Sequence, residues 1–159
     1  AFEKVFYEKQ AEQENEISES FDFSGKRVLL VEDHPLNVEV AKRLLEGKGF
    51  LVEHAANGLR AMEMFTTTAV GYYDAILMDI RMPEMDGLQA TYNIRRWRKD
   101  DAKTIPIIAM TANAFDDDVQ KSKAAGMDAH LAKPIDPKQM FKTLYDFINR
   151  GQKENNDAY

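Results

Sequence analysis

The stretch AILMDIRMPEMDG, residues 75–87, places an apolar run, an acid and a turn in direct succession. Residues 75–78 are all apolar, which indicates a strand buried on both faces, as in a parallel sheet covered by helices. Asp79 follows at the end of this run, the position from which open parallel sheets bind their ligands. Asp86 and Gly87 are typical of a loop that leads into a helix. The stretch therefore predicts a strand–loop–helix unit with a carboxylate at the strand end.

The same alternation continues on both sides of this unit. Further apolar runs of strand length cover residues 27–31, 51–55, 105–110 and 129–132. Apolar residues at helical spacing lie within 36–45, 59–65, 88–95, 115–124 and 140–148. Five such units predict an α/β three-layer sandwich, in which helices cover a five-stranded parallel sheet whose strands are buried on both faces.

The two ends of the chain lack this regular pattern. Residues 8–20 are rich in Glu, Gln, Ser and Asn and contain one large apolar residue, Ile17. We interpret residues 1–23 as an N-terminal segment, and both a linker and the tail of an upstream domain remain open. Residues 24–150 are the predicted domain, and 151–159 a short polar tail.

Composition narrows the class of protein. A chain of 159 residues suffices for one domain, and its net charge of −6 argues against a nucleic-acid partner. The absence of cysteine excludes disulfides and thiolate metal sites and suits a reducing compartment. No apolar run reaches the roughly 18 residues of a membrane helix, and no signal peptide is visible. We therefore expect a cytoplasmic domain without direct membrane contact, while a parent protein can still be membrane-anchored.

Four of the predicted strands end next to an acid, a hydroxyl or an ammonium group, and we consider these residues together with their immediate neighbours. They are Glu32 and Asp33 after the first strand, Asp79 after the third, Thr111 and Ala112 after the fourth, and Lys133 and Pro134 after the fifth. Because the carboxyl ends of parallel strands meet at one edge of a sheet, we expect these residues to converge.

Three carboxylates at one edge repel one another, since two unit charges 4 Å apart cost about 4 kcal/mol at an effective dielectric constant of 20. Either some of them are protonated or a cation lies among them. Oxygen ligands without Cys or paired His favour Mg²⁺ or Mn²⁺. A cation beside a nucleophilic carboxylate suits phosphoryl transfer to Asp79. Lys133 and the Thr111 hydroxyl would then bind phosphoryl oxygens, and the small Ala112 leaves room for the group.

Four runs resemble the response-regulator receiver family of two-component signalling: VLLVEDHPLN (28–37), AILMDIRMPEMDG (75–87), PIIAMTANAF (106–115) and GMDAHLAKPI (126–135). The resemblance extends over about residues 26–150. It implies a flavodoxin-like fold with five helices and the strand order 2-1-3-4-5, which is taken from the family. It also implies a phosphoacceptor domain that promotes its own phosphorylation and dephosphorylation.

The resemblance assigns roles on the acidic side of the site. Asp79 matches the phosphorylated residue, and Glu32 and Asp33 match the acidic metal pocket. Arg81 falls where the family supplies a backbone carbonyl to the metal. The implied ligand set is therefore Glu32, Asp33, Asp79 and the carbonyl of Arg81.

Further roles follow for the phosphate-binding side. Thr111, with Ala112 beside it, matches the switch hydroxyl, although the residues alone leave open that Thr111 only caps the next helix. Lys133 matches the family lysine, and the resemblance implies a cis peptide between Lys133 and Pro134.

His130 departs from the family pattern, because many receivers carry Tyr or Phe three residues before the lysine. A histidine there, together with Asn37 and the run MTANAF (110–115), is similar to receivers attached to hybrid sensor histidine kinases. The implied partners are the phosphohistidine domain of a histidine kinase and a histidine phosphotransfer protein. A hybrid kinase would carry its kinase activity outside this chain. The alternatives are a standalone regulator and a receiver-like interaction module that is not phosphorylated.

Two enzyme classes with related features fit less well. A dinucleotide-binding enzyme needs a glycine-rich loop after the first strand, where this chain has residues 32–35, EDHP. A haloacid-dehalogenase-type phosphatase needs a second Asp two residues after the nucleophile, where Arg81 stands.

Overall fold

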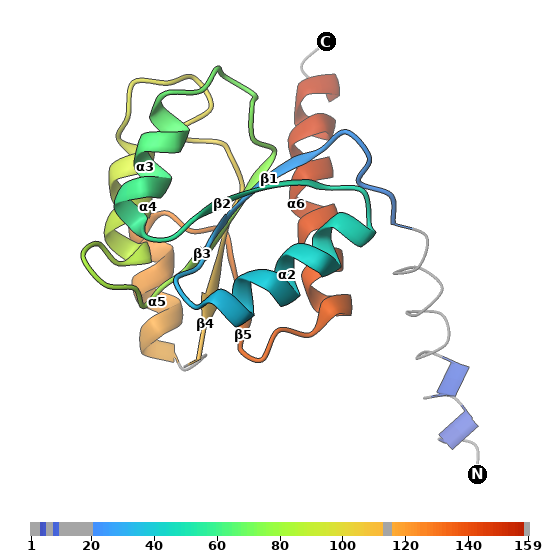
Figure 1. Cartoon of the computed structure of the whole chain (residues 1–159). Helices are drawn as coiled ribbons and strands as arrows, with labels where there is room; N and C mark the ends of the chain where they lie inside the picture. Colours follow the sequence, from blue (N-terminus) through green and yellow to red (C-terminus); the bar gives the residue numbers. More distant parts are fainter. Residues whose placement is uncertain (1–3, 6–7, 10–20, 113–115, 158–159) are drawn as a thin grey trace.

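The structure, a computed structural model, describes residues 4–5, 8–9, 21–112 and 116–157, without the side chains of 116–117 and 151–157. Strands and helices alternate along the chain from residue 27 (Figure 1). In chain order they are β1 (Arg27–Val31), α2 (Pro35–Gly47), β2 (Leu51–Ala55), α3 (Gly58–Thr66), β3 (Ala75–Asp79), α4 (Gly87–Arg95), β4 (Ile107–Thr111), α5 (Asp116–Ala125), β5 (Ala129–Ala132) and α6 (Pro137–Asp157).

The strands form one parallel sheet in the order β2-β1-β3-β4-β5, which confirms the predicted topology. Figure 1 shows α2 and α6 on one face of the sheet and α3, α4 and α5 on the other. Strand residues alternate between these faces, as the period of two requires. In β1, Val28 and Leu30 belong to the apolar cluster under α2 and α6, while Leu29 and Val31 belong to the opposite cluster.

Burial on both faces is confirmed for the central strands β3 and β4 and for most of β1. The prediction of burial on both faces is wrong for the two edge strands, β2 and β5. β2 exposes Leu51 and His54, and β5 contains one fully buried residue, Leu131. An edge strand has a neighbour on one side, so helix side chains cover it less completely.

Three element boundaries differ from the predicted ones. β4 starts at Ile107 rather than at residue 105, because Pro106 has no N–H to donate to a neighbouring strand. α6 runs to Asp157, so the polar segment from residue 151 continues the helix. α5 begins at Asp116, and Phe115, counted in the predicted helical stripe, lies outside the described residues.

Two aromatic residues attach the start of the described domain to its core. Phe21 stacks on Tyr145 of α6 with ring centroids 4.6 Å apart, and Phe23 stacks on Phe50 at 4.4 Å. Both phenylalanines are buried. The last part of the N-terminal segment therefore packs against the domain. Within the described residues, no helix combines the length and apolarity needed to cross a bilayer.

Candidate functional site

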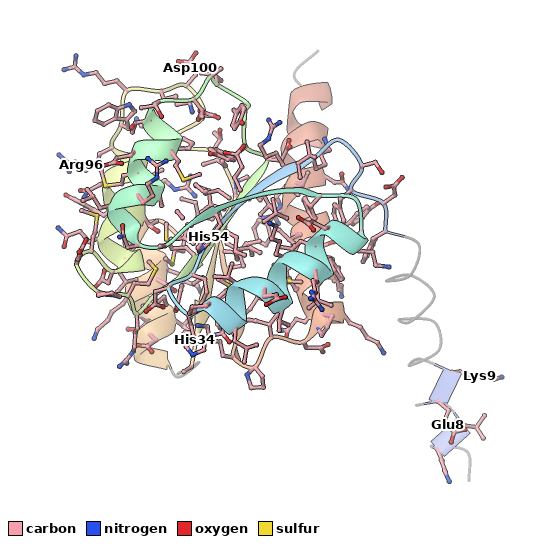
Figure 2. The ribbon with its side chains drawn as sticks, in the orientation of Figure 1. Glu8, Lys9, His34, His54, Arg96 and Asp100 are labelled. Carbon is pink, nitrogen blue, oxygen red and sulfur yellow. The ribbon has the colours of Figure 1, made fainter. Side chains whose placement is uncertain are left out.

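The register of the sheet brings the predicted site residues together at one edge. β1 and β3 pair so that Glu32, which follows β1, lies beside Asp79 at the end of β3. β4 ends in Thr111, and the backbone N–H of Lys133 donates to the Thr111 carbonyl at 2.8 Å. His34, where α2 begins, marks this edge in Figure 2.

The three acids form a compact cluster. One carboxylate oxygen from each of Glu32, Asp33 and Asp79 lies within 4.8 Å of the other two. Glu32 is 2% exposed and Asp79 is 5% exposed, whereas Asp33 is open to solvent. The cluster therefore has a buried floor and one side that solutes can reach.

Lys133 connects two of these acids. Its Nζ donates to Oδ2 of Asp79 at 2.9 Å and to Oε2 of Glu32 at 3.0 Å. Burial opposes the charged ammonium, but the hydrogen bonds to Asp79 and Glu32 outweigh burial and raise the pKa of Lys133. The Lys133–Pro134 peptide bond is cis. Lys133 is thus a charged donor aimed at the carboxylate of Asp79.

The environment separates the pKa values of the two buried acids. For Asp79, burial raises the pKa to about 6, and the charge of Glu32 adds to this rise against the opposing hydrogen bond from Lys133. For Glu32, burial also acts upward, but the hydrogen bonds from Lys133 and Asn37 bring its pKa below the ordinary value. Because the two carboxylates share one lysine, they titrate as a coupled pair.

This donor set suits a hard divalent cation. Three carboxylates face one ammonium, so the cluster keeps excess negative charge around oxygen ligands that Mg²⁺ prefers. The backbone N–H of Arg81 points to Oδ1 of Asp79 at 3.4 Å. Its guanidinium lies 3.9 Å from Asp118 of α5. The metal-ligating role of the Arg81 carbonyl stays a prediction.

The remaining predicted residues surround the cluster at different depths. Thr111 is buried at the end of β4. Ala112 is exposed beside it. His130 lies half-buried in β5 and lines a 260 Å³ cavity on the α5 side together with Ser122. His130 is thus separate from the acids.

Two residues around the cluster were not assigned a chemical role from the sequence. The side-chain amide of Asn37 donates to Oε1 of Glu32 at 3.1 Å. A Cβ atom on Gly87 would lie 2.1 Å from the carbonyl oxygen of Asp79, so this position requires glycine. For Asn37, the sequence did contain a signal: this residue lies one helical turn beyond the acids, within reach of them.

An apolar groove adjoins the acid cluster. It has a volume of 230 Å³ and lies between α2 and the start of α6, with Glu32 and Lys133 at one end. Leu36 and Val40 of α2 line it and are 63% and 52% exposed, so the predicted apolar stripe of this helix is not fully buried.

The sequence from residue 28 to residue 145 matches the family described as the response regulator receiver domain. This chain belongs to that family. It is a receiver domain of two-component systems and is homologous to the receiver domains of hybrid histidine kinases. The sheet order is the one that the resemblance implied.

Curated relatives of the receiver domain are much longer proteins. It is 35% identical over 151 residues to probable histidine kinase 1 of Oryza sativa subsp. indica, a match that covers 77% of this chain and 15% of the relative. It is 36% identical over 135 residues to hybrid signal transduction histidine kinase I of Dictyostelium discoideum, covering 84% of this chain and 8% of the relative. The chain thus spans a small part of the relatives it matches.

Solved structures confirm the predicted fold class. The receiver domain of a sensor histidine kinase from Pseudomonas aeruginosa superposes with a TM-score of 0.71 and 38% identity, covering 79% of this chain and 99% of that one. That structure holds a magnesium ion coordinated in the active site cleft. A CheY-like receiver from Methanospirillum hungatei gives a TM-score of 0.72 and 26% identity, covering 81% of this chain and 98% of that one.

Proposed function

We propose that this receiver accepts a phosphoryl group on Asp79 from a phosphohistidine, with Mg²⁺ bound beside it. The observation that carries the proposal is the position of Lys133, whose ammonium lies 2.9 Å from Oδ2 of the buried Asp79. A buried carboxylate that holds a charged donor and adjoins two further acids is arranged for charge neutralisation during phosphoryl transfer. Glu32, Asp33, Asp79 and the carbonyl of Arg81 would hold the ion.

The transfer is an in-line displacement at phosphorus. A carboxylate oxygen of Asp79 forms the new P–O bond as the P–N bond to the donor imidazole breaks, and the electron pair of that bond leaves with the imidazole nitrogen. Lys133 offsets negative charge on the transferred oxygens, and the hydroxyl of Thr111 donates to another of them. Bound Mg²⁺ would supply further neutralisation of those oxygens. Ala112, exposed and small, leaves space for the group.

Readout of the phosphorylated state begins at Thr111. A hydroxyl drawn toward the phosphoryl group would move the end of β4. His130 stands where many receivers carry an aromatic residue that responds to this movement. The histidine at this position supports a readout that differs from the usual Thr–aromatic coupling.

The partner that we propose is a histidine-bearing domain of a histidine kinase or of a phosphotransfer protein. The relatives support this partner class, since those named above are histidine kinases. The exposed apolar side chains of Leu36 and Val40 beside the acid cluster support docking at α2. These likenesses favour a hybrid histidine kinase as the parent protein of this receiver. The net charge of −6 argues against nucleic acid.

We further propose a division of the chain and a compartment. Residues 24–150 form the receiver, residues 1–23 are an N-terminal segment that is either a linker or the tail of an upstream domain, and residues 151–159 form a polar tail. The lack of cysteine supports placement in the cytoplasm.

Mass measurement after incubation with acetyl phosphate and Mg²⁺ tests the acceptor assignment. We expect the wild-type chain to gain the mass of one phosphoryl group and Asp79→Asn to gain none. Asp100→Asn is the matched control, because Asp100 lies at the opposite end of the molecule from His34 (Figure 2) and should leave the mass gain intact. Equal gains in the wild type and in Asp79→Asn would falsify the assignment.

A further inference from the structure

The side chain of Asn37 reaches the acid cluster from the first turn of α2. Its Nδ2 donates to Oε1 of Glu32 at 3.1 Å. The other oxygen of Glu32, Oε2, accepts from Nζ of Lys133 at 3.0 Å. Each carboxylate oxygen of Glu32 therefore has a side-chain donor, one from α2 and one from the segment that follows β5.

We propose that Asn37 is a positioning residue for the metal site, because it holds Glu32 in the orientation that lets the three carboxylates share one cation. This inference rests on the proposed function, since it needs Mg²⁺ to bind at the cluster. It concerns a residue that the receiver pattern does not assign to metal or phosphate.

Glu32 needs such a partner because it is 2% exposed and water cannot satisfy its oxygens. Apart from Asn37, Oε1 accepts from the backbone N–H of His34 at a longer 3.3 Å. Without the amide of Asn37, Oε1 keeps a weak donor, and the side chain can rotate toward solvent or toward Asp79. Either rotation disturbs the spacing of the three carboxylates.

The chemical type of Asn37 fits this role better than a structural one. Asparagine favours caps and turns over helix positions, so its place inside α2 calls for a reason. The N-cap residue of α2 is His34, which makes no side-chain capping bond, and the Asn37 amide donates to the Glu32 carboxylate rather than to the helix terminus. An amide donates without adding positive charge, so it orients Glu32 without repelling a cation as lysine would.

Partners that hold a metal-ligating side chain typically change metal affinity by 10- to 100-fold when they are removed. Because Asn37 is exposed, we expect the lower end, about tenfold weaker Mg²⁺ binding in Asn37→Ala. The substitution raises helix propensity and removes no buried group, so the variant should fold.

The test is titration calorimetry with Mg²⁺ on the full chain. The variants are Asn37→Ala, Glu32→Ala and the double variant, and Asn93→Ala on α4 is the matched control, since its amide contacts Met62 and Met85 instead. We expect Asn37→Ala to weaken binding about tenfold in the wild-type background and less than twofold in the Glu32→Ala background. Asn93→Ala should bind as the wild type does.

Unchanged affinity in Asn37→Ala overturns the inference, as does an equal loss in both backgrounds, because Asn37 would then act without Glu32. A wild-type chain that binds no Mg²⁺ overturns the metal site of the proposed function and the inference with it. Normal wild-type binding with unchanged Asn37→Ala binding overturns the inference alone.

Discussion

The ammonium of Lys133 lies 2.9 Å from the carboxylate of Asp79, although 54 positions separate the two residues in the chain. The same ammonium lies 3.0 Å from Glu32, which is 101 positions away. One cation therefore joins the ends of three strands. The stability and the chemistry of the site both depend on this connection.

Removing the ammonium of Lys133 distinguishes its effect on phosphoryl transfer from its effect on Mg²⁺ binding. In Lys133→Met we expect the rate of phosphorylation by acetyl phosphate to fall by roughly 100-fold, because a charged donor to the transferred oxygens is lost. Mg²⁺ should bind as tightly as before or more tightly, since a cation that repels the ion is gone. Stopped-flow rates and calorimetry measure the two quantities.

The matched control is Lys138→Met, which removes an exposed lysine from the first turn of α6 and should change neither quantity. A parallel loss of Mg²⁺ affinity and rate in Lys133→Met would show that Lys133 acts mainly by holding Glu32 and Asp79 in place.

The raised pKa of Asp79 predicts a pH-dependent stability change. Its value of about 6 in the folded chain exceeds the value of roughly 4 expected for an unfolded aspartate. Between these values the folded state binds more protons than the unfolded state, so the free energy of unfolding decreases as pH rises through this window. Without Mg²⁺, Asp79→Asn should therefore be more stable than the wild type at pH 8, by on the order of 2 kcal/mol. The difference should disappear near pH 4.

Urea unfolding at the two pH values measures this difference, with Asp100→Asn as an exposed control that should not show it. Lower stability of Asp79→Asn at pH 8 would mean that the ion pair with Lys133 outweighs the burial of the carboxylate.

A methyl group at position 87 should disturb both packing and site geometry. The Cβ of Gly87→Ala would meet the carbonyl oxygen of Asp79 at 2.1 Å, a distance that requires backbone movement. We expect a loss of about 1–3 kcal/mol of unfolding free energy and a lower rate of phosphorylation.

Gly47→Ala at the end of α2 is the matched control, because a Cβ there meets nothing within 4 Å. It should leave phosphorylation unchanged and keep or raise stability by up to about 1 kcal/mol. If both glycine variants lost the same stability, helix conformation rather than the contact with Asp79 would be the cause.

The groove beside the acid cluster predicts a difference between two phosphodonors. Val40 is 52% exposed on α2, and Val40→Asp places a charge on this apolar surface. We expect transfer from a phosphorylated histidine domain to fall by about tenfold, because a buried charge opposes docking, while phosphorylation by acetyl phosphate stays unchanged. Radiolabel transfer and mass measurement report the two reactions.

Val70→Asp provides the control, since Val70 is similarly exposed but precedes β3 and therefore lies toward the opposite edge of the sheet from Asp79. Equal transfer to Val40→Asp and to Val70→Asp would exclude α2 as the docking surface.

Several features of the domain could be predicted because they depend on local pattern. The run of residues 75–79 is apolar and then acidic, so it specifies a buried strand with a carboxylate at its end. The edge strands were predicted less well, since the exposure of Leu51 depends on which strand lies at the edge of the sheet. Likewise, the exposure of Leu36 depends on where α2 crosses the sheet, although its helical spacing was visible.

The sequence by itself determined that Glu32, Asp33, Asp79 and Lys133 stand at strand ends, because strand periodicity and strand-end position are properties of neighbouring residues. It identified the receiver family through four short runs. The tertiary structure alone decided that Lys133 binds both Glu32 and Asp79, that Asn37 holds Glu32, and that burial separates the pKa values of the two acids. These relationships depend on the register of the sheet and on local desolvation, which arise only when distant segments pack together.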